Sequence, residues 1–82
     1  MQNSREQIKL DVIKIISDEL DVALDSIKED TSLQNDLEAD SLDAISIGLA
    51  IEEKFNIQLD DNTVQQFTVV KDIIDNLVRI VT

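Results

Sequence analysis

Residues 37–43, Leu-Glu-Ala-Asp-Ser-Leu-Asp, place a serine at the start of a helix that is predicted to run from Asp40 or Ser41 to about Phe55. Asp40 and Asp43 fall in the first turn, where carboxylates accept bonds from free backbone N–H groups. From its position alone, Ser41 is ordinarily interpreted as a helix cap. The chain has no histidine and no cysteine. No histidine is therefore present to act as the base that would activate a nucleophilic serine. Ser41 is better explained as an attachment point.

The same helix carries two apolar stripes, although a helix that faces a core needs only one. At about 100° per residue, the stripe predicted to face the core consists of Ala44, Ile47, Gly48, Ile51 and Phe55. The second stripe consists of Leu42, Ile45 and Leu49. A small bundle can rarely bury both, which favours an exposed docking surface. Periodicity alone leaves open that the second stripe packs under the preceding loop.

The first helix is predicted to begin at Asn3 or Ser4. Ser4 and Gln7 have the spacing of a capping box, in which each side chain binds the other residue's backbone N–H. The buried face of this helix is predicted to consist of Ile8, Val12, Ile15, Ile16 and Leu20. In the long loop that follows, residues 21–39, the predicted anchors to the core are Leu24, Ile27, Leu33 and Leu37.

Two more helices are predicted after the second one. A short helix starts near Asp60 and covers residues 61–67, and a last helix covers residues 69–81 after a cap at Thr68. The inner face of the last helix is predicted to consist of Val70, Ile73, Ile74, Leu77 and Val81. The fold class is therefore all-α: one domain, residues 1–82, forming a small four-helix bundle with three longer helices, one short helix and a long first loop.

The formal net charge is −11 in 82 residues. Nucleic-acid binding is excluded, because it requires a basic surface. The charge favours basic protein partners, or it simply keeps a monomer in solution. The absence of cysteine fits a reducing cytoplasm. No apolar run approaches about 20 residues and the first residues do not form a signal peptide, so we expect a soluble protein without membrane insertion.

The pattern Leu37-x-x-Asp40-Ser41-Leu42-Asp43, followed by Glu52-Glu53-Lys54-Phe55, resembles the acyl carrier protein family. The order of predicted helices, the length and the acidity resemble this family over nearly the whole chain. The resemblance implies that a phosphopantetheinyl transferase, the holo-acyl carrier protein synthase, joins 4′-phosphopantetheine from coenzyme A to Ser41, with Asp40 and Leu42 beside it. The thiol of this arm would hold acyl groups of fatty acid, polyketide or related lipid biosynthesis, and the chain itself would not be an enzyme.

The resemblance also implies roles for two further groups of residues. Positions that would meet basic patches on acyl-transferring and synthase enzymes are Asp40, Leu42, Asp43, Ile45, Leu49, Glu52 and Glu53. Candidates for lining a cavity that holds the acyl chain are Ile47, Ile51, Phe55, Ile57, Leu59 and Ile73.

Four positions depart from the family pattern. Glu38 replaces a glycine that is common two residues before Asp40, and Ser46 replaces a further helix acid. The proline that usually precedes the third helix is absent. Gly48 lies inside a helix, where glycine costs about 1 kcal/mol relative to alanine; it could allow close approach of another helix, widen the cavity or be a tolerated defect. These departures predict a specialised carrier.

Other classes of protein fit the sequence less well. A calcium-binding EF-hand needs a glycine at its sharp turn, and residues 25–36 contain none. No metal site is expected, beyond weak cation binding near Asp36, Asp40 and Asp43. An enzyme would need acid–base groups gathered in a pocket. The alternatives that remain are a carrier of aminoacyl or D-alanyl groups and an acidic helical adaptor.

Overall fold

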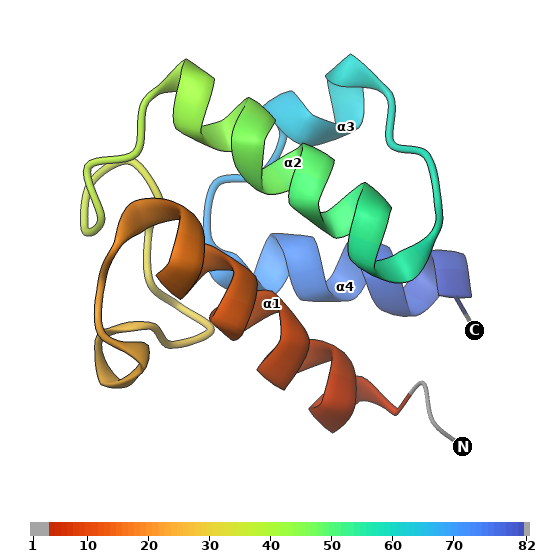
Figure 1. The fold of residues 1–82 in the computed structure, drawn as a ribbon, viewed down its shortest axis with the longest axis horizontal. Coiled ribbons are helices and arrows are strands. Elements are labelled where there is room, and N and C mark those ends of the chain that lie inside the picture. Colours follow the sequence, from red (N-terminus) through yellow and green to blue (C-terminus); the bar gives the residue numbers. More distant parts are fainter. Residues whose placement is uncertain (1–3, 82) are drawn as a thin grey trace.

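The computed structural model describes residues 4–81 and is a bundle of helices (Figure 1). Its elements are α1 (Arg5–Leu20), a 3-10 turn η1 (Leu24–Ser26), α2 (Ser41–Phe55), α3 (Asp61–Gln65) and α4 (Val70–Val81). Extended pairing within the described part of the chain is limited to an isolated bridge between Ser32 and Val69. The predicted all-α class, the three longer helices, the short helix and the long first loop are confirmed.

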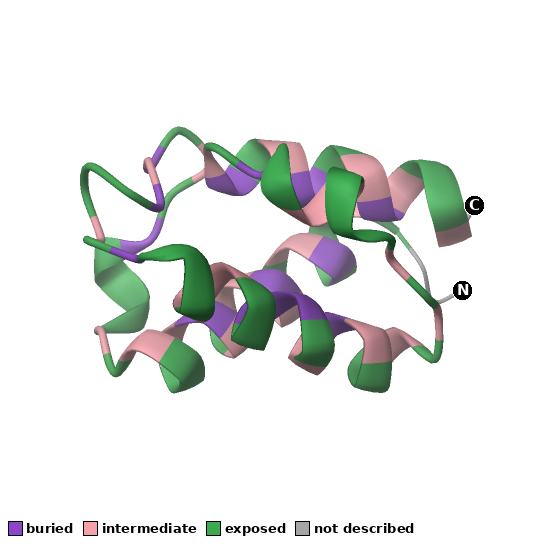
Figure 2. Ribbon diagram, turned by 90° about the horizontal axis from the view of Figure 1, so that it is seen from above, coloured by how far each residue is buried: buried purple, intermediate pink, exposed green. Residues whose placement is uncertain are grey.

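The helices α1, α2 and α4 pack around one core, which lies between their inner faces (Figure 2). Its buried apolar residues are Ile8, Val12, Ile16, Ile27, Leu33, Ala39, Ile47, Ile51, Phe67, Val70, Ile73, Ile74 and Leu77. Almost all are aliphatic, and burial of each large side chain stabilises the fold by about 1.5–3 kcal/mol. Of the residues predicted to be buried on α1 and α4, Ile15, Leu20 and Val81 are only partly buried.

The first residue of α1 and the last of α4 lie at the same end of the molecule, and α2 begins at the opposite end (Figures 1 and 2). The loop before α2 is joined to the start of α4 by backbone hydrogen bonds. The N–H groups of Lys71 and Val70 donate to the carbonyls of Glu29 and Thr31 at 2.8 and 3.0 Å. These bonds order a loop that has little regular structure of its own.

Three of the four predicted loop anchors lie against the core. Ile27 and Leu33 are buried and Leu37 is half-buried. Leu24 is 53% exposed, and its prediction as an anchor is wrong, because it opens the turn η1, which contains no buried residue.

Two predicted helix caps differ from the structure. The Ser4 hydroxyl accepts the Gln7 N–H at 3.2 Å, but the Gln7 side chain donates to Asp11 at 3.2 Å instead of closing a capping box. At α4, the Asp72 carboxylate accepts the N–H groups of Thr68 and Val69, both at 3.1 Å. The Thr68 hydroxyl donates to the Gln66 carbonyl at 3.4 Å. The first N–H groups of α4, those of Val70 and Lys71, donate to the loop carbonyls of Thr31 and Glu29 and leave no donor there for a Thr68 cap.

Glu38 has a left-handed backbone conformation, with φ 57°. Asp21 and Asn56 share this conformation where they end α1 and α2, a place where such geometry is common. Glu38 lies in the loop, and a side chain in this conformation costs about 1–2 kcal/mol. Glu38 therefore holds strained backbone where the family pattern has glycine.

We expect Glu38→Gly to raise the free energy of unfolding by about 1 kcal/mol, because glycine adopts positive φ without the steric cost. Urea denaturation measures the change. Glu38→Ala is the matched control, since it removes the same charge but keeps a Cβ. An equal gain from both variants would assign the effect to charge and not to backbone strain.

A cluster of charged side chains joins α1, the loop and α4. The Arg5 guanidinium donates to both carboxylate oxygens of Glu29 at 3.1 and 3.0 Å, and to Asp75 Oδ1 at 2.9 Å. Lys9 Nζ lies 3.5 Å from Glu29 Oε2. The hydrogen bond from Arg5 lowers the pKa of Glu29 below its ordinary value of 4.5. Arg5 is thus the residue that joins the three segments, and the ionised Glu29 carboxylate holds the loop to α1.

A carboxylate with a lowered pKa stabilises the fold above its ordinary pKa, and this contribution disappears as the pH falls. Glu29→Gln should therefore lower the thermal midpoint at pH 7, and the difference from the native chain should shrink as the pH falls below 4.5 and through the lowered pKa of Glu29. Asp25→Asn, which removes an exposed charge outside the ion pairs of residues 4–81, is the control. A midpoint difference that does not depend on pH would contradict this role.

Candidate functional site

Ser41 is the first residue of α2, and its side chain is exposed. The cap of this helix is Asp40, whose Oδ1 accepts the Asp43 N–H at 2.9 Å. Asp43 Oδ2 accepts the Asp40 N–H at 3.2 Å, which completes a reciprocal capping box. The ordinary interpretation of Ser41 as the cap is therefore wrong, because Asp40 occupies the extended capping position. Within residues 4–81 the Ser41 hydroxyl has no hydrogen-bond partner, and it is available for modification.

The start of α2 is suited to a phosphate ester. The backbone N–H groups of Ser41 and Leu42 form no hydrogen bond with the described part of the chain. Such free donors at a helix start attract phosphate. The neighbouring carboxylates of Asp40 and Asp43 repel a phosphate group and partly offset this attraction. The residues present fit a phosphodiester on the Ser41 oxygen.

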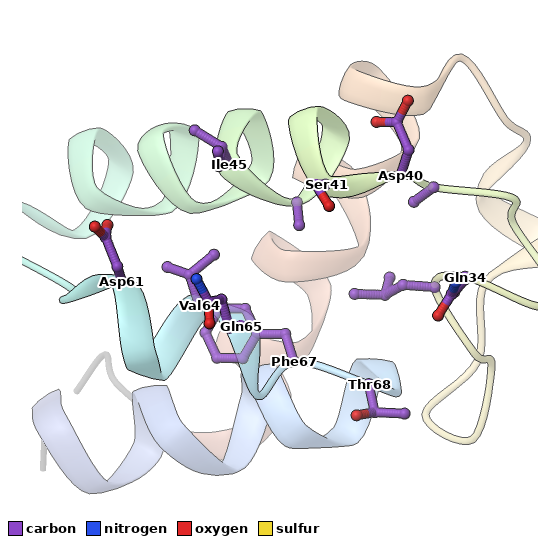
Figure 3. Close-up of a pocket in the computed structure, with 12 residues that line it drawn as sticks. Gln34, Asp40, Ser41, Ile45, Asp61, Val64, Gln65, Phe67 and Thr68 are labelled. Atoms are coloured by element: carbon purple, nitrogen blue, oxygen red, sulfur yellow. The ribbon is translucent and has the colours of Figure 1, made fainter.

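A pocket of about 420 Å³ lies beside Ser41, between the start of α2, the preceding loop and α3 (Figure 3). Val64 and Phe67 lie on the side of this pocket opposite α2, whereas the Asp40 carboxylate points away from them (Figure 3). The lining residues are Leu33, Gln34, Ala39, Asp40, Ser41, Ala44, Ile45, Asp61, Val64, Gln65, Phe67 and Thr68. This mixture of apolar and amide side chains suits a chain that alternates methylene and amide groups.

None of the six predicted cavity residues lines this pocket. Ile47, Ile51 and Ile73 are completely buried in the core, and Phe55, Ile57 and Leu59 pack against it. Their role around an acyl chain stays a prediction. The pocket residues that sequence reasoning missed are Leu33, Val64 and Phe67, which come from the loop and from α3 and its end. No helical periodicity relates such segments to Ser41.

Gly48 lies where α3 crosses α2. A Cβ atom added to Gly48 would lie 3.2 Å from Val64 Cγ2, which is closer than ordinary contact. Of the explanations offered for this glycine, close approach of another helix is the one that the structure favours. Because Val64 also lines the pocket, Gly48 brings α3 near Ser41.

The second stripe of α2 is exposed, as predicted. Leu42, Ile45 and Leu49 are 73%, 52% and 60% exposed, so the alternative of packing under the loop is wrong. Of the predicted acidic contacts, Asp40 and Glu53 are exposed and Asp43 is half-buried. Glu52 is half-buried, and its carboxylate accepts the Leu59 N–H. The exposed stripe and the exposed acids Asp40 and Glu53 thus all lie on α2 or at its cap.

Within residues 4–81, no group of three or more acidic side chains is placed to hold a metal ion. No helix in the same part of the chain is both long and apolar enough to span a membrane.

Comparison with known proteins identifies the chain. The family model for the "Phosphopantetheine attachment site" matches residues 11–77. The acyl carrier protein of Nitratidesulfovibrio vulgaris (strain DP4) is 44% identical over 64 residues, which cover 78% of this chain and 84% of that protein. The acyl carrier protein of Prochlorococcus marinus (strain MIT 9515) is 39% identical over 69 residues, covering 84% and 86%. The chain therefore belongs to the acyl carrier protein family and contains a phosphopantetheine attachment domain.

Proposed function

We propose that Ser41 is the residue that carries 4′-phosphopantetheine and that the arm holds acyl groups as thioesters. The observation that carries this assignment is the exposed Ser41 hydroxyl, which lies inside the matched segment and has no partner within residues 4–81. In the loading step the Ser41 oxygen bonds to the phosphorus of coenzyme A that bears pantetheine, and adenosine 3′,5′-bisphosphate leaves. The arm supplies the thiol that the chain lacks.

We expect native protein, incubated with coenzyme A and a phosphopantetheinyl transferase, to gain the mass of one phosphopantetheine group. Ser41→Ala should gain nothing, because no other hydroxyl has the same place at the start of α2. Intact mass spectrometry measures both. Ser46→Ala, which removes another exposed serine of α2, is the control and should be modified fully. Modification of Ser41→Ala would contradict the proposal. So would a native chain that stays unmodified under conditions in which a control carrier is converted.

The partners we propose are the transferase and the acyl-transferring and synthase enzymes, each with a basic patch beside an apolar one. Charge complementarity supports this, because acids flank the exposed row of Leu42, Ile45 and Leu49. The long-range field of a chain with net charge −11 speeds and orients encounter. A row of three side chains adds little contact area, so that binding stays weak enough for exchange between enzymes.

We expect Leu49→Glu to lower kcat/KM for loading by the transferase by about tenfold or more, because it puts a charge into the apolar row. Circular dichroism should show an intact fold, since the residue is exposed. Leu10→Glu is the matched control, because Leu10 is an exposed leucine (53%) on α1. Equal losses from both variants would show that the added charge, and not the position, matters.

The departures from the family pattern support a specialised carrier. We propose that Ser46, in place of an acid, and the strained Glu38 change which enzymes accept this protein. Fatty acid, polyketide and related lipid pathways all use cargo of the proposed kind. The chain acts as a substrate of other enzymes and not as a catalyst, and the absence of cysteine permits a cytoplasmic location. Ordinary rates of chain elongation by the major fatty acid synthase enzymes would count against specialisation.

A further inference from the structure

Glu52 collects the hydrogen bonds of the loop between α2 and α3. Its carboxylate oxygen Oε2 accepts the backbone N–H of Leu59 at 2.6 Å. Its carbonyl accepts the N–H of Asn56, which ends α2, and that of Ile57 at 3.1 Å. Three backbone donors of one loop therefore bond to a single half-buried residue.

The residue after Leu59 carries this order into α3. Asp60 Oδ1 accepts the Thr63 N–H at 2.8 Å and caps the helix. Hydrogen bonds from the backbone and the side chain of Thr63 lower the pKa of Asp60. Two consecutive residues are thus held by hydrogen bonds, Leu59 to Glu52 and Asp60 to the first turn of α3.

The helix α3 depends on contacts at its ends. It has five residues, none of them fully buried, whereas isolated helices shorter than about 12–15 residues are marginal in water. After its last residue, the Leu33 N–H donates to the Thr68 carbonyl at 3.0 Å. On the other side, the bond between Glu52 and Leu59 holds the chain that enters the helix. Loss of either contact would free one end.

The position of α3 determines the shape of the pocket beside Ser41. Asp61, Val64 and Gln65 of this helix line the pocket. Val64 already packs tightly on α2 at Gly48. Movement of α3 away from α2 would therefore widen the pocket.

We infer that Glu52 is a positioning residue: its carboxylate oxygen fixes the loop that enters α3 and thereby sets the width of the pocket beside Ser41. A direct contact with a basic partner would depend on the negative charge of Glu52. Positioning of the loop depends instead on a side-chain oxygen that is long enough to reach the Leu59 N–H. The nature of the group that enters the pocket rests on the proposed function, whereas the role of Glu52 in the loop does not.

Three variants separate charge from reach. Glu52→Gln keeps an acceptor oxygen at the same distance and removes the charge. Glu52→Asp keeps the charge, but its side chain is one methylene shorter and cannot reach Leu59 as closely. Glu53→Gln removes the neighbouring exposed charge, which has no partner within residues 4–81, and serves as the control.

The first measurement is amide hydrogen exchange on the unmodified protein. In Glu52→Asp, the amides of Leu59 and Val64 should exchange about tenfold faster or more, since the shorter side chain loses the hydrogen bond to Leu59 and the loop opens more readily. In Glu52→Gln the increase should stay within about threefold, and Glu53→Gln should match the native chain. The Val12 amide in α1 reports global opening. Equal acceleration at Val12, or a Glu52→Gln that exchanges as fast as Glu52→Asp, would overturn the inference.

The second measurement is the rate of loading of Ser41 by the transferase. Equal loss in Glu52→Gln and Glu53→Gln, with native exchange in Glu52→Asp, would show that Glu52 is a partner contact and would overturn the inference. If no variant and no native protein is loaded, the proposed function fails, while the exchange experiment still decides the role of Glu52.

Discussion

The reciprocal hydrogen bonds between Asp40 and Asp43 fix where α2 begins, and the site depends on this start. They make Asp40 the last extended residue and Ser41 the first helical one. The fully buried Ile47 and Ile51 fix how the helix is rotated about its axis. Together, the cap and the core contacts place the Ser41 hydroxyl in solvent and the apolar stripe on the outer face. Two acids therefore have a structural task as well as an electrostatic one.

Much of the fold follows from the spacing of apolar residues. The recurrence of Ile8, Val12 and Ile16, and of Val70, Ile73 and Leu77, gives the inner faces of α1 and α4, because a buried stripe repeats every three or four residues. The second stripe of α2 was predicted for the same reason. Its exposure was not fixed by periodicity, because the stripe would look the same under a loop.

Features that depend on tertiary contacts could not be predicted in this way. Leu24 has the same chemistry as Leu33, yet only Leu33 is buried in the core and lines the pocket. The cap predicted at Thr68 is absent because the first N–H groups of α4 bond to carbonyls of the distant loop. The capping box predicted at Ser4 is not closed, because the Gln7 side chain donates to Asp11. The pocket joins Phe67 to Ser41 across 26 positions of sequence, and no local pattern records that contact.

Both chain ends of the described bundle lie away from the start of α2 (Figure 1). A neighbouring domain or a solid support joined near Ser4 or Val81 would thus lie at the end of the molecule opposite Ser41 and would not obstruct the phosphopantetheine arm. Several such units could be strung along one polypeptide, each with its cargo facing outward. This arrangement of short helices is therefore compatible with a carrier domain inside a multidomain polypeptide as well as with a freely diffusing carrier.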